Sequence, residues 1–184
     1  MRTRTFLGVL ACSAMAVGLA AAPAAADPTD DTVVTFELLA GTLDIVAPPS
    51  ADLGTGAPGT VINGSLGTVA VTDGRAAPDA SWLATVTSTD FTAGAATPSE
   101  TVLASEVDYW SGPATATTGN GTFTPAQTNL AGAQALDNVA PLTAFTHTGG
   151  TGNNTAGWSA SISVNVPLDS QAGDFTGTVT HSVA

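Results

Sequence analysis

Residues 157–166 alternate between two kinds of side chain, and no other feature of the sequence constrains the fold as strongly. One set of positions holds Trp158, Ala160, Ile162, Val164 and Val166, and the positions between them hold Ser159, Ser161, Ser163 and Asn165. Successive side chains of a β-strand point to opposite faces, so a period of two predicts a strand with one apolar and one polar face. A helix would need apolar residues three or four positions apart, and this pattern excludes one here.

The same alternation recurs elsewhere in the chain. It predicts a strand over 175–183, where Phe175, Val179 and His181 share one face, and another over 82–87, led by Trp82. Further strands are predicted at 32–38, 42–46, 66–72 and 101–109, with short ones near 122–124 and 142–146 inside long loops. Tight turns are predicted at Asn63-Gly64, Asp73-Gly74, Asn120-Gly121 and Gly149-Gly150.

Composition supports an all-β chain with very little helix. Lys is absent and Glu occurs three times, while Thr, Val, Ser and Gly dominate. About seven to nine short strands with polar outer faces and long Gly/Thr-rich loops predict a single Ig-like β-sandwich, in which each sheet buries one face against the other. This domain is expected to span residues 27–184.

Residues 1–26 have the layout of a cleaved secretion signal. Arg2 and Arg4 precede an uncharged run from Phe6 to Ala22, and the small residues 24–26 follow it. A membrane anchor is the alternative interpretation, but the run is rich in Ala and Gly. Lipidation of Cys12 is a weaker alternative. Cleavage would remove the only cysteine and leave 158 residues, enough for one domain with a core. The protein is therefore expected to be secreted.

The chain that remains after cleavage is strongly acidic. Arg75 is its single Lys or Arg among 15 Asp and Glu, which gives a side-chain charge of −14. Such a charge repels nucleic acid and anionic membranes, so neither is an expected partner. Contact with an anionic wall polymer would have to depend on aromatic stacking and hydrogen bonds.

The sequence offers no set of residues typical of an enzyme, and a non-enzymatic protein without a cofactor is expected. The two histidines, His147 and His181, are interpreted as a loop residue beside a glycine turn and a packed residue of a strand. Glu106 and Asp108 are interpreted as a solvated strand face. No metal site is expected, although a structural Ca²⁺ held by aspartates is kept as an alternative. The aspartates considered are Asp30, Asp31, Asp73, Asp79 and Asp90.

Three residues are candidates for ligand contact. Tyr109 and Trp110 end a predicted strand before a turn, where an exposed aromatic pair could stack on sugar rings. Arg75 is favoured as the partner of Asp73 or Asp79 in a salt bridge, with a ligand contact as the alternative. Trp82 and Trp158 lead strong strands and are predicted to anchor the core.

Two stretches resemble the motifs of the WxL-type cell-surface domains of Gram-positive bacteria. The first comprises Gly67–Arg75, Ser81–Val86 and Asp90-Phe91, and the second is Ala172–Ser182. The matching positions are Asp73, Arg75, Trp82, Phe91, Phe175 and His181. The resemblance covers most of residues 32–184. The chain departs from the family in its Trp82-Leu83-Ala84 order and in having His181 where the second motif usually has Trp.

The resemblance implies a secreted β-rich domain that attaches non-covalently to the cell wall through peptidoglycan. We therefore expect a surface protein whose partner is peptidoglycan or another wall glycan. The alternative is a structural or adhesive subunit that assembles with other surface proteins when residues 174–183 add as a strand to a partner's sheet. A wall hydrolase is a third interpretation, and it would need two carboxylates roughly 5–10 Å apart in a cleft.

Overall fold

The computed structural model describes residues 30–184, and the predicted secretion signal lies outside this range. Residues from Leu38 to Ala184 form one compact unit, and residues 30–37 do not belong to it. Residues 30–42 contain no helix or strand. The strand predicted at 32–38 is therefore not formed, and that prediction is wrong. Its apolar side chains are exposed, which removes the burial that would stabilise a strand there.

The described part of the chain is all-β, as the alternation predicts. Its long strands are β2 (Val61–Ala77), β3 (Trp82–Ser88), β10 (Leu142–Thr148) and β11 (Gly152–Asn165). The shorter strands are β1 (Leu43–Val46), β4 (Phe91–Thr92), β5 (Thr101–Val102), β6 (Val107–Trp110), β7 (Ala114–Thr118), β8 (Thr122–Pro125), β9 (Gln134–Ala135) and β12 (Val179–Val183). The helical residues form three single 3₁₀ turns, η1 (Pro98–Glu100), η2 (Ala104–Glu106) and η3 (Leu130–Gly132). Between residues 30 and 184 no helix has the length and apolar character needed to cross a membrane.

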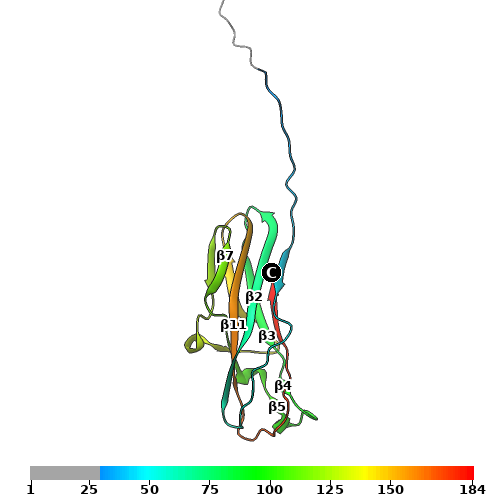
Figure 1. The fold of residues 1–184 in the computed structure, drawn as a ribbon, viewed down its shortest axis with the longest axis vertical. Coiled ribbons are helices and arrows are strands. Elements are labelled where there is room, and N and C mark those ends of the chain that lie inside the picture. Colours follow the sequence, from blue (N-terminus) through cyan, green and yellow to red (C-terminus); the bar gives the residue numbers. More distant parts are fainter. Residues whose placement is uncertain (1–29) are drawn as a thin grey trace, which may run out of the picture. The chain divides into compact units, whose positions relative to one another are not determined.

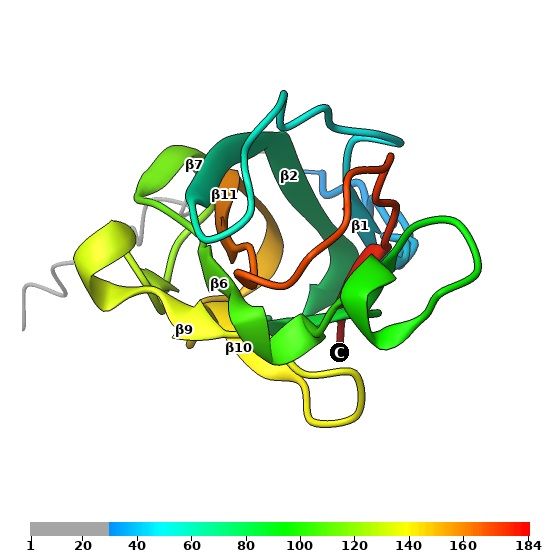
Figure 2. The same cartoon turned by 90° about the horizontal axis from the view of Figure 1, so that it is seen from below.

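Two antiparallel sheets form a sandwich-like domain (Figures 1 and 2). The larger sheet has the order β1-β2-β11-β6-β9, with β7 also paired to β11, and the smaller has the order β12-β3-β10-β8. Strands β4 and β5 form a separate two-stranded sheet. In the sequence they lie between β3 and β6. The centre of the larger sheet is the long ladder between β2 and β11, which runs from Gly152 opposite Ala77 to Asn165 opposite Val61.

This ladder explains why two predicted turns are wrong. Asn63-Gly64 and Asp73-Gly74 both lie inside β2, paired with β11 or β1. Backbone pairing to strands distant in sequence outweighs the local turn preference of these dipeptides. The other two predictions are confirmed, because Asn120-Gly121 connects β7 to β8 and Gly149-Gly150 connects β10 to β11.

Two predicted strands are shorter or interrupted. The range 101–109 is divided by η2, and the range 175–183 forms a continuous strand only over β12, with an isolated bridge between Thr92 and Thr176. The remaining predictions at 42–46, 66–72, 82–87, 122–124, 142–146 and 157–166 all fall on strands.

The core between the sheets is built around stacked aromatic rings. Trp158 is fully buried and its ring lies 4.8 Å from that of Phe145, at an interplanar angle of 18°. The Trp82 ring is 6.0 Å from Phe145 on the other side. Both tryptophans are core residues, as predicted from their places at the start of strong strands.

Candidate functional site

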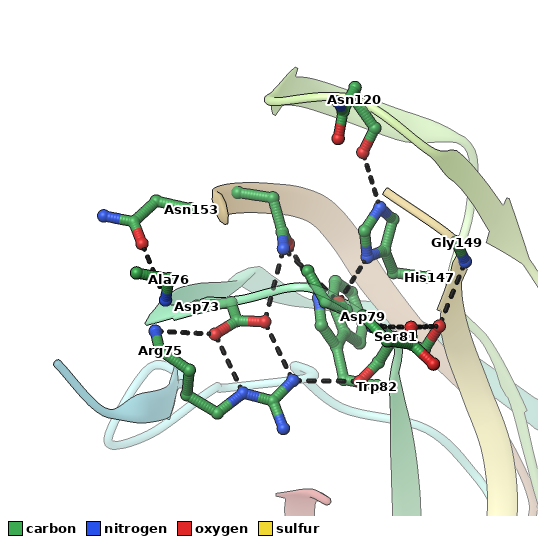
Figure 3. Close-up of polar contacts among 12 residues, drawn as sticks. Asp73, Arg75, Ala76, Asp79, Ser81, Trp82, Asn120, His147, Gly149 and Asn153 are labelled. Carbon is green, nitrogen blue, oxygen red and sulfur yellow. Dashed lines mark hydrogen bonds and ion pairs between the residues drawn. The ribbon is translucent and has the colours of Figure 1, made fainter. Parts of the chain in front are cut away.

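One hydrogen-bonded group contains three residues of the first family motif, Asp73, Arg75 and Trp82 (Figure 3). We call this group the polar cluster, and strands of both sheets contribute to it. Its members are Asp73, Arg75, Trp82, His147 and Asn154. They come from β2, β3, β10 and β11, so four strands contribute to a group that no short stretch of sequence contains.

Asp73 is the centre of the polar cluster. Its side chain is fully buried, and its two oxygens accept four hydrogen bonds. Oδ1 accepts from the Arg75 backbone N–H (3.0 Å) and Nε (2.9 Å), and Oδ2 accepts from Arg75 Nη2 (2.8 Å) and Asn154 Nδ2 (3.3 Å). The Arg75 guanidinium is the main reason that the pKa of Asp73 lies below its usual value. The salt bridge favoured from the sequence is therefore present, with Asp73 as the partner.

Arg75 also holds the start of the next strand. Its Nη2 donates to the Ser81 carbonyl oxygen at 2.9 Å, just before β3. Asp79 instead accepts from the Ser81 hydroxyl and backbone N–H, and it shapes the short connection between β2 and β3. About a third of the Arg75 side chain is exposed, but the hydrogen bonds above occupy its Nε and Nη2. Its main contacts are thus structural.

Asn154 connects Asp73 to the aromatic core. Its Oδ1 accepts from Trp82 Nε1 at 2.8 Å, and its Nδ2 donates to Asp73 and, at 3.4 Å, to the Ala80 carbonyl oxygen. Burial of a polar group is costly unless it is hydrogen-bonded, and here the carboxylate, the amide and the indole satisfy one another. Asn154 was not predicted from the sequence, because its partners are more than 70 positions away.

His147 corrects a prediction. It is not an exposed loop residue but a buried residue of β10, 1% exposed. Its Nδ1 lies 2.7 Å from the Ala80 carbonyl oxygen and its Nε2 lies 2.9 Å from that of Asn120. The ring therefore lies between the connection that precedes β3 and the turn between β7 and β8. Gly121 is needed beside it, because its φ is 101° and a Cβ there would overlap the His147 ring.

A second hydrogen-bonded chain links three aromatic residues of the two sheets. Trp158 Nε1 donates to the Tyr109 hydroxyl at 3.2 Å, and that hydroxyl lies 3.2 Å from His181 Nε2. Burial raises the pKa of Tyr109 to about 12, so its hydroxyl keeps its proton at neutral pH. His181 is a packed residue of β12, as predicted. Tyr109 is fully buried, so the expected exposed aromatic pair of Tyr109 and Trp110 is not formed.

We predict that His181 makes the domain less stable in mild acid. Burial lowers the pKa of His181 to about 4, whereas in the unfolded chain it is about 6.5. Between these values the unfolded state binds a proton that the folded state does not, so the free energy of unfolding falls as the pH drops from 6.5 to 4. The loss attributable to His181 is about 3 kcal/mol.

Urea unfolding at pH 7.5, 6, 5 and 4 would measure this loss. His181→Phe should remove this part of the pH dependence, while the part due to carboxylates such as Asp73 stays in both proteins. Parallel pH profiles for the two proteins would contradict the prediction.

Of the two neighbours Tyr109 and Trp110, Trp110 is the one that reaches the surface. Residues of β6 alternate between buried and partly exposed, with Val107 and Tyr109 inward and Asp108 and Trp110 outward. Trp110 pairs with Ser161 of β11, which in turn pairs with Ser65 of β2. Cross-strand partners share a face, so Trp110 lies in a row with two serines on the outer face of the larger sheet.

The next row of that face is also polar. Asp108 pairs with Ser163, and Ser163 pairs with Asn63 on the far side. Asn165 Nδ2 donates to Asp108 Oδ2 at 3.2 Å and to the Glu106 carbonyl oxygen at 3.2 Å. Glu106 belongs to η2 rather than to the strand, so the predicted common strand face of Glu106 and Asp108 is wrong. We call Trp110, Ser161, Ser65, Asp108 and Asn63 the outer-face platform.

The other two motif aromatics, Phe91 and Phe175, are partly buried against the core. Both line a cavity of about 550 Å³ whose walls are residues 51–58 and 170–177. A smaller cavity of about 170 Å³ adjoins it and is lined by His181 and Leu66 among others. No local sequence pattern indicates these cavities, because their walls include irregular segments that meet only in the folded chain.

The aspartates considered for calcium are spread over the domain. Within residues 30–184, no three His, Cys, Asp or Glu side chains gather as a metal ion would require. Asp73 uses its oxygens on Arg75 and Asn154, and Asp90 Oδ1 accepts from the Ala104 backbone N–H at 2.8 Å.

Comparison with known proteins adds no further assignment. No family model matches the chain, and no curated protein is significantly similar to it.

Proposed function

We propose that this protein is a secreted, non-enzymatic surface domain that associates non-covalently with a cell-wall glycan, with peptidoglycan as the expected partner. The observation that carries the proposal is the outer-face platform, in which the partly exposed Trp110 adjoins hydroxyl and amide side chains on a sheet face. An aromatic ring beside hydroxyls and amides can stack on a sugar and hydrogen-bond to its hydroxyl groups.

The charge of the domain determines what kind of contact is suitable. With a side-chain charge of −14 after residue 26, the protein is repelled by anionic wall polymers at long range. Stacking and hydrogen bonds between neutral groups are screened little by salt, so binding through Trp110 and the serines would persist at high ionic strength.

The resemblance to WxL-type domains supports the same proposal. Of the six motif positions, Asp73, Arg75 and Trp82 belong to the polar cluster, and Phe91, Phe175 and His181 line the two adjoining cavities. These residues maintain the domain, and none of them belongs to the outer-face platform. Wall binding is thus proposed for a surface that the motifs do not contain.

Sedimentation with purified peptidoglycan sacculi would test wall binding. We expect residues 27–184 to sediment saturably with sacculi freed of teichoic acid, at low and high salt alike. Trp110→Ala should weaken binding at least tenfold, the loss typical of an aromatic residue at the centre of a contact. Leu103→Ala is the matched control, because Leu103 is an exposed apolar residue (52%) that is not a member of the platform, and it should leave binding unchanged.

Two results would contradict the proposal. One is a protein that stays in the supernatant under every condition, and the other is an equal loss of binding in the Trp110 and Leu103 variants.

Assembly by strand addition is a second candidate function, and the position of β12 favours it. β12 pairs with β3 on one side and ends the order of the smaller sheet. The strand predicted to add to a partner's sheet is therefore at an edge, where backbone groups on one side are available for pairing.

A further inference from the structure

The segment Thr32–Leu39 has the pattern of a strand but is not one in the single chain. Val34, Phe36 and Leu38 alternate with Thr35 and Glu37. Between residues 30 and 184, no other segment exposes large apolar side chains at such density: Val33 89%, Val34 80%, Phe36 91%, Leu38 79% and Leu39 77%. Exposed apolar groups concentrated in this way mark an interaction surface.

Strand β2 of the larger sheet is too short to pair with this segment. Pairing with β2 begins at Gly41, whose N–H donates to the Gly74 carbonyl oxygen at 2.7 Å. β2 runs antiparallel to this part of the chain and ends at Ala77, three residues further. No backbone of β2 therefore remains to pair with residues 32–37.

An apolar cavity in the same domain matches the segment. The cavity of about 550 Å³ lies between residues 51–58 and 170–177, which run side by side in Figures 1 and 2. Gly59 N–H donates to the Val166 carbonyl oxygen at 3.0 Å and fixes one end of these walls. Its apolar lining comes from Leu53, Ile62, Phe91, Val166 and Phe175, which are only partly buried.

We propose that the Thr32–Leu39 segment of one copy seats in this cavity of a second copy, and that the exchange is reciprocal. Val34, Phe36 and Leu38 share one face of an extended strand and would enter the cavity, over a length of about 13 Å. Thr35 and Glu37 lie on the opposite face and would stay in water. In this contact, alternate side chains of an extended segment would fill a pocket.

Area and complementarity favour a second copy as the occupant. A buried Val, Leu or Phe side chain removes on the order of 100 Å² from water, so the three inward residues supply roughly 300 Å². The acceptor surface loses a comparable area, and two reciprocal contacts then reach roughly 1,200 Å², the lower end of the range for specific protein interfaces. Each chain carries both the segment and the cavity, as a symmetric exchange requires.

Charge sets a condition on this association. Each copy carries −14 after residue 26, and Asp30, Asp31 and Glu37 add to the repulsion at the segment itself. Salt screens repulsion between like charges, so the dimer should become tighter as the ionic strength rises. The inference does not rest on wall binding, because self-association is measured without sacculi, and it is separate from the candidate in which residues 174–183 add to a partner's sheet.

Sedimentation equilibrium of residues 27–184, which include the whole compact unit, would test the proposal. We expect a monomer–dimer equilibrium that shifts toward the dimer between 0.05 and 1 M NaCl. Phe36→Asp places a charge on the inward face and should weaken the dimer roughly 30-fold or more. Thr35→Asp adds the same charge on the outward face and should have a small effect that salt removes.

Mixing two defective variants separates donor from acceptor. Phe175→Asp damages the cavity, and thermal unfolding would establish that this variant is folded. Each variant alone should be monomeric, whereas a mixture of Phe36→Asp and Phe175→Asp should dimerise, because one intact segment meets one intact cavity. A native chain that stays monomeric at every salt concentration would overturn the proposal, and so would equal dimerisation of the Phe36 and Thr35 variants. Protection of residues 32–39 from hydrogen exchange in a monomer would also overturn it, in favour of the chain's own cavity as the acceptor.

Discussion

Trp158→Ala is expected to lower the free energy of unfolding by about 4 to 5 kcal/mol, the largest effect of any single substitution considered for this domain. Trp158 is fully buried, stacks on Phe145 at 4.8 Å, and lies in the central strand β11. Its removal leaves a cavity between the sheets that rigid strands cannot close. It also leaves the Tyr109 hydroxyl without the N–H that it accepts.

Urea unfolding followed by circular dichroism would measure this loss. Trp158→Phe keeps the ring but removes the hydrogen bond to Tyr109, so it should cost about 1 to 2 kcal/mol. Trp110→Ala is the matched control, since it removes the same residue type from a partly exposed position and should cost less than about 1 kcal/mol. Similar losses in the Trp158→Ala and Trp110→Ala variants would show that the core is not organised around Trp158.

Asp73→Asn is expected to cost about 3 kcal/mol, although it changes the side chain by a single group. The carboxylate accepts from Arg75 through three hydrogen bonds and from Asn154 through one. An amide offers one oxygen and an NH₂ group, and that NH₂ group would face the N–H groups of Arg75 or Asn154. Arg75 would keep its charge without its partner, but its partial exposure to water limits the loss.

The pH dependence of this variant provides a second readout. Arg75 holds the pKa of Asp73 below its usual value, so the stabilisation is complete above the carboxyl's unfolded pKa of about 3.8 and is lost as the pH falls through the lower folded value. In the Asp73→Asn variant, this loss of stabilisation at low pH should be absent. Asp79→Asn is the control, because Asp79 is exposed and bonds only to Ser81, and it should cost less than about 1 kcal/mol.

A double-mutant cycle with Arg75→Met would isolate the ion pair. The double variant should be more stable than the sum of the two single losses implies, since neither partner is then left unpaired. Strict additivity would contradict the assignment of Arg75 as the structural partner of Asp73.

The polar cluster also explains why the motif residues are hard to interpret from sequence. Asp73, Arg75 and Trp82 are close enough in the chain to be recognised together, and a salt bridge of Arg75 with Asp73 or Asp79 was predicted. Asn154 and His147 complete the cluster from β11 and β10, and nothing near them in the sequence indicates what they contact. The pairing of β2 with β11 and of β3 with β10 brings them there.

The sequence by itself determined the fold class, most strands and the core tryptophans, because period-two alternation and residue size act within a few positions. Only the tertiary structure decided that Asn63-Gly64 and Asp73-Gly74 lie within β2, that His147 and Tyr109 are buried, and that residues 32–39 stay unpaired. Each of these depends on which strands lie side by side. Partners that are 70 or more positions apart in the chain leave no local pattern, and their contacts form only when the two sheets close on each other.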